Sequence, residues 1–243
     1  MVITDKRLSA GNTMADLITL YHGPSQIVAS PVYGASRKNN DFGLGFYCTE
    51  SNELAKEWAV SSLRDGFSNR YVLNPEYLRI LNLNSPDYTI LNRIAVLTEH
   101  RLFNIRNPIA ARAKRYLIEH FGINVNACDL ITGYRADDSC FDFAEAFLNN
   151  TITVVQLSRA MGLGKPGELI VLKSPSAFSM IRYEWFETAQ KDLYYVLRKA
   201  RNDKASQAYL KIQEEEDDGI HIQDILRGGI TNDDPRIPGN IFA

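Results

Sequence analysis

The chain has 243 residues, of which 45% are hydrophobic and 23% are charged, and its formal net charge is −2. This composition is typical of a globular protein, and a chain of this length can bury a core without disulfides or metals. The near-neutral charge excludes a global attraction to nucleic acid or anionic membranes, and no segment approaches the roughly 20 apolar residues of a membrane helix.

The first third of the chain predicts short strands around one helix. Residues 17–22 are rich in β-branched and aromatic residues and are stopped by Gly23-Pro24, which indicates a strand. A loop-like stretch at 24–40 separates it from a second strand at 45–49. The elements expected after these are a helix over 51–65 and short strands at 71–73 and 78–83.

The middle of the chain predicts several helices and one strand. Pro108 suits the first turn of a helix that runs to Phe121, and Gly122 suits its end. Thr153 can cap a helix through Met161. The other elements expected in this region are helices over 87–104 and 139–148 and a strand at 129–133.

The last third contains the clearest buried strand, at Glu168–Lys173, and a further strand candidate at 181–186. A long charged helix over 187–213 leads into the acidic run at 214–218, and the tail from Gly219 is expected to have little regular structure. The order of strands and helices predicts an α+β fold rather than a regular βα alternation. We expect one domain over 1–186, with a C-terminal helix and tail over 187–243 packed on it.

Cysteine usage and the N-terminus predict a cytoplasmic protein. Cys48, Cys128 and Cys140 show no metal-binding spacing, and an odd, unpatterned count is typical of reduced thiols. Residues 1–7 lack the apolar stretch of a signal peptide. The four histidines do not form a metal-binding pattern, so no metal site is expected.

Three short motifs concentrate the residues that can carry chemistry. Leu20-Tyr21-His22-Gly23 puts a histidine at the end of one strand, and Asp41-Phe42-Gly43-Leu44-Gly45-Phe46-Tyr47 puts a tyrosine on the next. Much later, Gly167-Glu168-Leu169-Ile170-Val171 puts a glutamate at the start of a buried strand. No GxGxxG or GxxxxGK[ST] motif occurs, so the common nucleotide-binding fingerprints are absent from the sequence.

The triple resembles the His, Tyr, Glu set of the ADP-ribosyltransferase superfamily, in the branch shared by diphtheria toxin and the poly(ADP-ribose) polymerases. More narrowly, residues 17–185 resemble an uncharacterised bacterial family of ADP-ribosyltransferase-like domains. The residues that carry this resemblance are Tyr21-His22-Gly23, Arg37, Asp41-Phe42-Gly43, Gly45-Phe46-Tyr47, Trp58-Ala59 and Ala136-Asp137-Asp138. It implies two split sheets around a cleft for NAD, with flanking helices.

The resemblance implies catalytic roles for three residues, with NAD as a substrate and no metal. His22 would bond a ribose hydroxyl, and Tyr47 would stack on the nicotinamide ring. Glu168 would hold the ribose and stabilise the positive charge that develops when the nicotinamide bond breaks. The backbone of Gly23 would pair with the nicotinamide amide, where the missing side chain permits close approach.

Further residues have one functional and one structural interpretation each. Tyr21, Asp41 and Phe42 belong to the implied NAD-binding set. Arg37 would bond the NAD pyrophosphate, or else form an ordinary surface ion pair. Asp137 and Asp138 would contact the substrate or a target base, or else cap the helix that follows.

The sequence therefore predicts a mono-ADP-ribosyltransferase that modifies a macromolecular acceptor, either protein or nucleic acid. In bacteria, this resemblance points to toxins and phage-defence effectors, which implies an inhibitory partner protein. Two alternatives stay open: an NAD glycohydrolase, in which water is the acceptor, and a non-catalytic module that binds NAD or a partner. A local basic face for nucleic acid would comprise Arg93, Arg101, Arg106, Arg112, Lys114 and Arg115, which ordinary surface charge also explains.

Overall fold

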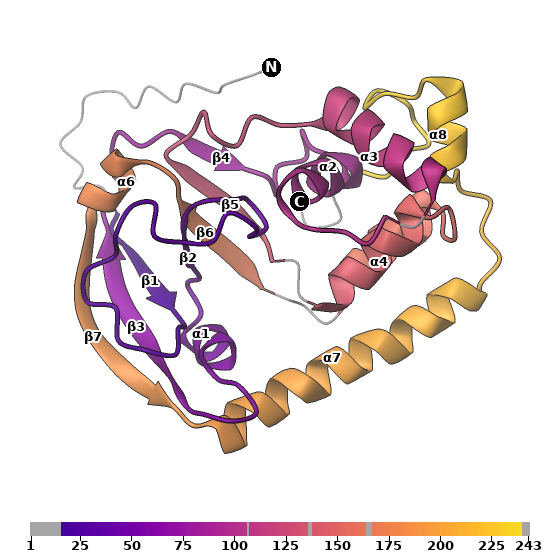
Figure 1. Cartoon of the computed structure of the whole chain (residues 1–243). Helices are drawn as coiled ribbons and strands as arrows, with labels where there is room; N and C mark the ends of the chain where they lie inside the picture. The colour runs from indigo at the N-terminus through magenta and orange to yellow at the C-terminus, as the bar shows by residue number, and fades with distance from the viewer. Residues whose placement is uncertain (1–15, 106, 136–137, 164–166, 240–243) are drawn as a thin grey trace.

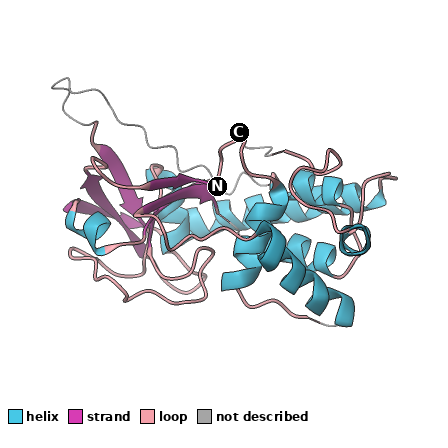
Figure 2. Cartoon of the chain, turned by 90° about the horizontal axis from the view of Figure 1, so that it is seen from above, coloured by secondary structure: helices cyan, strands magenta, loops and turns pink. Residues whose placement is uncertain are grey.

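Two sheets form the strand-rich part of the molecule (Figures 1 and 2), in a computed structural model that describes residues 16–105, 107–135, 138–163 and 167–239. The first sheet is antiparallel, with the order β1 (Ile18–His22), β3 (Gly66–Leu73) and β7 (Ile181–Ala189). The second has the order β2 (Phe46–Cys48), β6 (Glu168–Leu172), β5 (Leu130–Tyr134) and β4 (Ile80–Asn82). Only its β4–β5 pair is parallel among these described strands.

The two sheets meet where β1 passes the end of β2. Tyr21 and Thr49 exchange both backbone hydrogen bonds, with N–H to oxygen distances of 2.7 and 2.9 Å. Residues of both sheets share one apolar cluster, which includes Leu20, Phe46 and Tyr71. Because side chains alternate along a strand, Tyr47 and its register partner Val171 belong to a different cluster, with Val96.

Helices gather beside the sheets, as Figure 2 shows. The largest apolar cluster joins residues of α2 (Ile90–His100), α3 (Pro108–Phe121), α4 (Asp138–Leu148), α5 (Val154–Met161) and α8 (Ile222–Gly228). Two short helices, α1 (Asn52–Ala59) and α6 (Pro175–Ser179), accompany the strands. Together with the two sheets, these helices confirm the predicted α+β class.

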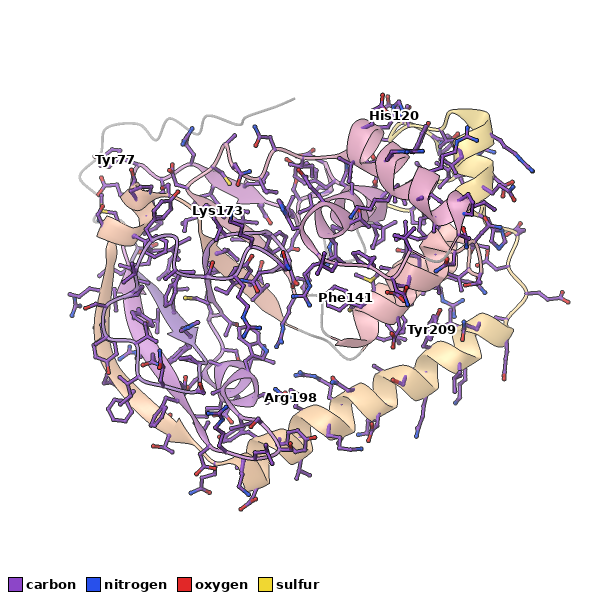
Figure 3. All side chains as sticks on the ribbon, viewed as in Figure 1. Tyr77, His120, Phe141, Lys173, Arg198 and Tyr209 are labelled. Atoms are coloured by element: carbon purple, nitrogen blue, oxygen red, sulfur yellow. The ribbon has the colours of Figure 1, made fainter. Side chains whose placement is uncertain are left out.

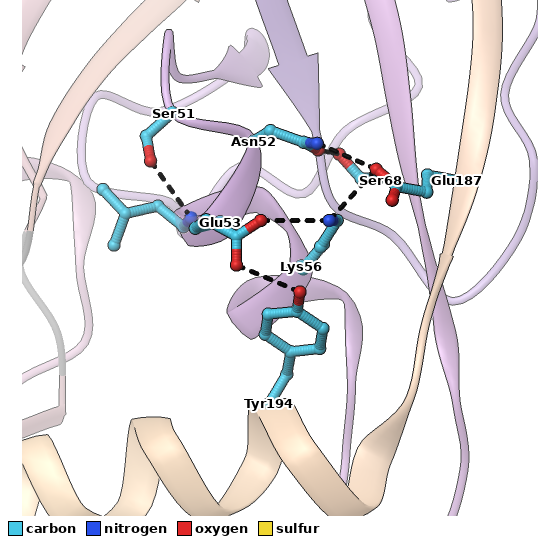
Figure 4. A network of polar contacts seen from close by, with 8 residues as sticks. Ser51, Asn52, Glu53, Lys56, Ser68, Glu187 and Tyr194 are labelled. Atoms are coloured by element: carbon cyan, nitrogen blue, oxygen red, sulfur yellow. Dashed lines mark hydrogen bonds and ion pairs between the residues drawn. The ribbon is translucent and has the colours of Figure 1, made fainter.

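The long helix α7 (Lys191–Glu214) runs from the end of β7, past α1, toward α4 (Figure 1). At its start, the Tyr194 hydroxyl donates to Glu53 over 3.0 Å, in the polar network that Figure 4 shows. Further along, the Tyr209 ring lies 4.2 Å from the Phe143 ring of α4. The described residues of this C-terminal part, 187–239, therefore share contacts and core with the rest of the chain.

Several predicted elements are confirmed closely, including the helix Pro108–Phe121 and the strand that begins at Glu168. The prediction of an irregular tail is wrong, since α8 forms there and Ile222 and Ile225 are fully buried. β7 extends to Ala189 because it pairs with β3 as far as Gly66, so α7 begins later than expected. No helix among the described residues is long and apolar enough to cross a bilayer.

Candidate functional site

A pocket of about 260 Å³ lies where β1 ends beside β2 and α1. This volume is slightly below the roughly 300–1,000 Å³ of small-molecule sites, so it suits part of a dinucleotide rather than a whole one. The residues that line it are His22, Gly23, Asn40, Asp41, Tyr47, Trp58, Arg101, Arg135 and Leu169. His22, Gly23, Asp41 and Tyr47, which the sequence predicted as site residues, therefore meet at one place.

His22 is held in one orientation and one tautomer. Its Nδ1 lies 2.7 Å from the backbone oxygen of Tyr47, and because a carbonyl only accepts, Nδ1 carries the proton. Burial lowers the pKa of His22 to about 4, against the opposing effect of this hydrogen bond. The ring is therefore neutral at pH 7, with Nε2 as an acceptor for a hydroxyl or amide donor.

Gly23 needs its missing side chain for a reason the sequence did not reveal. A Cβ atom there would lie 1.9 Å from the backbone oxygen of Ala55 and 3.1 Å from the nitrogen of Ala59. The end of β1 thus lies directly against the backbone of α1. This close packing brings Trp58, on the same helix, into the pocket wall.

Tyr47 lines the pocket, and its hydroxyl is bonded to the loop before it. The hydroxyl donates to the Gly43 oxygen over 2.7 Å and accepts from the Phe42 N–H over 3.0 Å. Burial raises the pKa of Tyr47 well above its usual value, so the hydroxyl stays protonated. With its polar end occupied, the side chain offers the pocket a fixed aromatic ring rather than an acid or a nucleophile.

Two arginines give the pocket cationic groups. Arg101, at the end of α2, lies 3.7 Å from the Asp41 carboxylate and donates to the Asn39 oxygen over 3.0 Å. Its guanidinium also lies 4.1 Å from the centre of the Phe141 ring. Arg135 follows β5 and lies 4.9 Å from the Trp58 ring centre. Such guanidinium groups are well suited to phosphate oxygens.

Glu168, predicted as a catalytic residue, is not among the residues that line the pocket. It precedes the lining residue Leu169 on β6, and its carboxylate accepts from Asn84 over 2.5 Å. Burial raises the pKa of Glu168, and Glu50 raises it further, while the Asn84 hydrogen bond opposes them. The carboxylate is thus held by one amide, next to a second carboxylate.

The other predicted site residues lie outside the lining set. Arg37 is exposed, and its backbone oxygen accepts from Asn40. Tyr21 bonds Thr49 through its backbone, and Phe42 is buried in the core. Asp137 falls outside the described residues, as does the side chain of Asp138, the first residue of α4. Arg93, predicted for a basic face, is buried.

The residues that line the pocket lie within a segment that matches a protein-family model. A family model described as "Protein of unknown function (DUF3990)" matches residues 18–183. The chain belongs to the DUF3990 family. No curated protein and no solved structure matches it. Every residue that lines the pocket falls inside the DUF3990 range, whose description states no activity.

Five lining residues were not predicted as site residues: Asn40, Trp58, Arg101, Arg135 and Leu169. Trp58 stood among the residues that carry the family resemblance, without a role. Arg101 and Arg135 reach the pocket from the ends of α2 and β5. The sequence marked Arg101 only as part of a basic face, and it gave Arg135 no role. In the described part of the chain, no group of His, Cys, Asp and Glu gathers that could hold a metal ion.

Proposed function

We propose that this chain is a mono-ADP-ribosyltransferase, which cleaves NAD and transfers ADP-ribose to a macromolecular acceptor. The observation that carries the proposal is the meeting of His22, Gly23 and Tyr47 in one pocket with Arg101 and Arg135. These groups match the parts of a nicotinamide dinucleotide. His22 offers a neutral acceptor for the ribose, Gly23 a backbone for the nicotinamide amide and Tyr47 a ring for the nicotinamide. The two arginines offer cations for the pyrophosphate. The fold that we propose is the split-sheet arrangement of ADP-ribosyltransferases.

Each group has a part in the proposed binding mode. A ribose hydroxyl donates to His22 Nε2, which the Tyr47 carbonyl leaves as the acceptor nitrogen. The nicotinamide ring stacks on Tyr47, whose hydroxyl bonds to Phe42 and Gly43 keep the ring in place. Arg101 and Arg135 bind the pyrophosphate oxygens, the role that the sequence assigned to Arg37.

The proposed reaction breaks one bond and forms one. The bond between ribose C1′ and the nicotinamide nitrogen breaks, its electron pair leaves with nicotinamide, and C1′ becomes cationic in the transition state. An acceptor nucleophile then bonds C1′ and loses its proton. In this proposal, the Glu168 carboxylate stabilises the cation. Its support is the resemblance, together with the place of Glu168 at the start of β6, one residue before the lining residue Leu169.

The test is incubation of the purified chain with NAD that is labelled in the adenylate part, together with cell lysate. Matched lysates are treated with protease or nuclease, because the acceptor is either protein or nucleic acid. Glu168→Gln is the test variant, and Glu216→Gln, in the exposed acidic run, is the control. We expect labelled macromolecules with the wild type and the control, and a loss of about 100-fold or more with Glu168→Gln.

The outcomes separate the alternatives. Free nicotinamide without a labelled macromolecule indicates a glycohydrolase, in which water takes the place of the acceptor. Intact NAD after long incubation with every lysate overturns the proposal and favours a binding module. The toxin or phage-defence role, and the inhibitory partner that it implies, require the acceptor to be identified first.

A further inference from the structure

Lys173 directly follows β6 (Figure 3) and carries a buried ammonium group. It is not among the residues that line the pocket. Its Nζ donates to two backbone oxygens, that of Phe42 over 2.5 Å and that of Leu44 over 2.6 Å. Both acceptors are neutral carbonyls. A buried ammonium is costly for stability, and an apolar residue often serves as well in such a place.

The two carbonyls belong to the segment that leads into the pocket. Both backbone groups of Phe42 are hydrogen-bonded to side chains: its oxygen accepts from Lys173, and its N–H donates to the Tyr47 hydroxyl. The next residue, Gly43, accepts from Tyr47 and has a φ of +72°, a conformation that favours glycine. Lys173 and Tyr47 thus hold the same short stretch of backbone, 42–44.

Other contacts fix the rest of this segment. Gly45 N–H donates to Ser36 Oγ over 3.0 Å, and Gly43 N–H donates to the Asn40 oxygen over 2.9 Å. Asp41, at the start of the segment, lines the pocket and faces Arg101. The segment therefore sets the positions of an aromatic ring and of an ion pair in the pocket wall.

We infer that Lys173 is a positioning residue for the pocket, which acts through the segment 41–45 to hold Tyr47 and Asp41 in their binding geometry. The inference rests on the proposed function for the identity of the ligand. The positioning itself concerns the backbone and can be measured without a ligand.

The first experiment measures amide hydrogen exchange residue by residue, by NMR, in the ligand-free protein. The variants are Lys173→Met, which removes the charge and the donors, and Lys173→Gln, which keeps an amide donor. Lys199→Met, at an exposed lysine on α7, is the control. In Lys173→Met, we expect the amides of Phe42, Gly43 and Gly45 to exchange about tenfold faster than in the wild type. The increase should be smaller in Lys173→Gln, and the control should exchange at the wild-type rate.

The second experiment measures NAD cleavage by the same variants. Lys173→Met should disturb the binding residues Tyr47 and Asp41 but leave Glu168 in place. We therefore expect KM for NAD to rise about tenfold and kcat to change less, with partial rescue in Lys173→Gln. If the wild type does not cleave NAD, the proposed function fails while the exchange result still tests the positioning.

Two exchange results would overturn the inference. One is unchanged exchange at Phe42, Gly43 and Gly45 in both Lys173 variants. The other is an equal increase at these amides and at those of β3 and β5, because a general loss of stability would then explain the effect.

Discussion

Two lysine side chains are buried in the described part of the chain, and their partners differ. Lys56, on α1, lies 3.0 Å from the carboxylates of both Glu53 and Glu187 (Figure 4). Burial alone lowers the pKa of Lys56, but its hydrogen bonds to Glu53, Glu187 and Tyr194 raise the pKa well above its usual value. Lys173 bonds carbonyls, and burial lowers the pKa of its ammonium.

The difference separates a contact that stabilises the fold from one that shapes a site. Lys56 connects α1 with β7 through Glu187 and with the start of α7 through the Tyr194 ring, 5.5 Å away, and α1 is far from both elements in the sequence. Asn52 adds to the same network by bonding Glu187 and Ser68. Lys173 instead holds a single loop segment against the pocket. We therefore expect loss of Lys56 to affect unfolding and loss of Lys173 to affect ligand binding.

The largest expected effect is on the fold. Lys56→Met leaves Glu53 and Glu187 without their shared cation, and both are partly exposed, so water compensates some of the loss. We expect a loss of about 2 kcal/mol in the free energy of unfolding. Urea unfolding measures it, with Lys199→Met as the control. A loss no larger than that of the control would contradict the account of the network.

A second effect depends on pH and concerns His22. Its pKa of about 4 in the fold lies below the value near 6.5 of an unfolded histidine, so the unfolded chain binds more protons between these two values. Stability should therefore fall as the pH drops from about 6.5 to about 4, by about 1 to 2 kcal/mol after allowing for partial exposure of the ring.

His22→Asn should remove this pH dependence, since an asparagine amide keeps a donor for the Tyr47 carbonyl but does not titrate. His120→Asn, at an exposed histidine, is the control. Unfolding measured at pH 7, 5 and 4 provides the comparison. Equal acid sensitivity in wild type and His22→Asn would show that His22 is not the group responsible.

A third effect concerns the cations of the pocket. Arg135→Gln removes a lining guanidinium, and we expect NAD affinity to fall about tenfold, as for loss of a charged hydrogen bond. Arg37→Gln, at an exposed arginine outside the lining set, should change affinity much less. Calorimetric titration with NAD measures both. A larger loss with Arg37→Gln would restore the role that the sequence assigned to it.

The smallest effect is on the pH profile of catalysis. The Asn84 hydrogen bond lowers the pKa of Glu168, so Asn84→Ala should raise it. If the ionised Glu168 carboxylate stabilises the cation, the rate of NAD cleavage by Asn84→Ala should begin to fall at a higher pH than in the wild type as the solution is acidified. Glu50 is the neighbouring acid that also raises this pKa, and in Glu50→Gln the fall should begin at a lower pH. No movement in either variant would exclude Glu168 as the titrating group.

The sequence predicted the parts of the site that depend on local pattern. His22 and Tyr47 stand on strands with clear turn signals, so the strands could be expected from the sequence, while the family resemblance implied that the two residues share a site. Arg101 and Arg135 could not, because tertiary packing alone brings the ends of α2 and β5 to β1. In the tail, Gly228-Gly229 suggested irregular chain, yet Gly229 adopts a φ of +61° and ends α8 as a helix cap.

The central claim is that the pocket of His22, Gly23 and Tyr47 binds NAD. The most direct test is an NMR titration of the labelled protein with NAD, followed at the His22 ring, the Gly23 amide and the Arg135 side chain. We predict saturable shifts at these three groups and none of comparable size at the exposed His120. Shifts that are absent, or that gather away from the pocket, would contradict the claim.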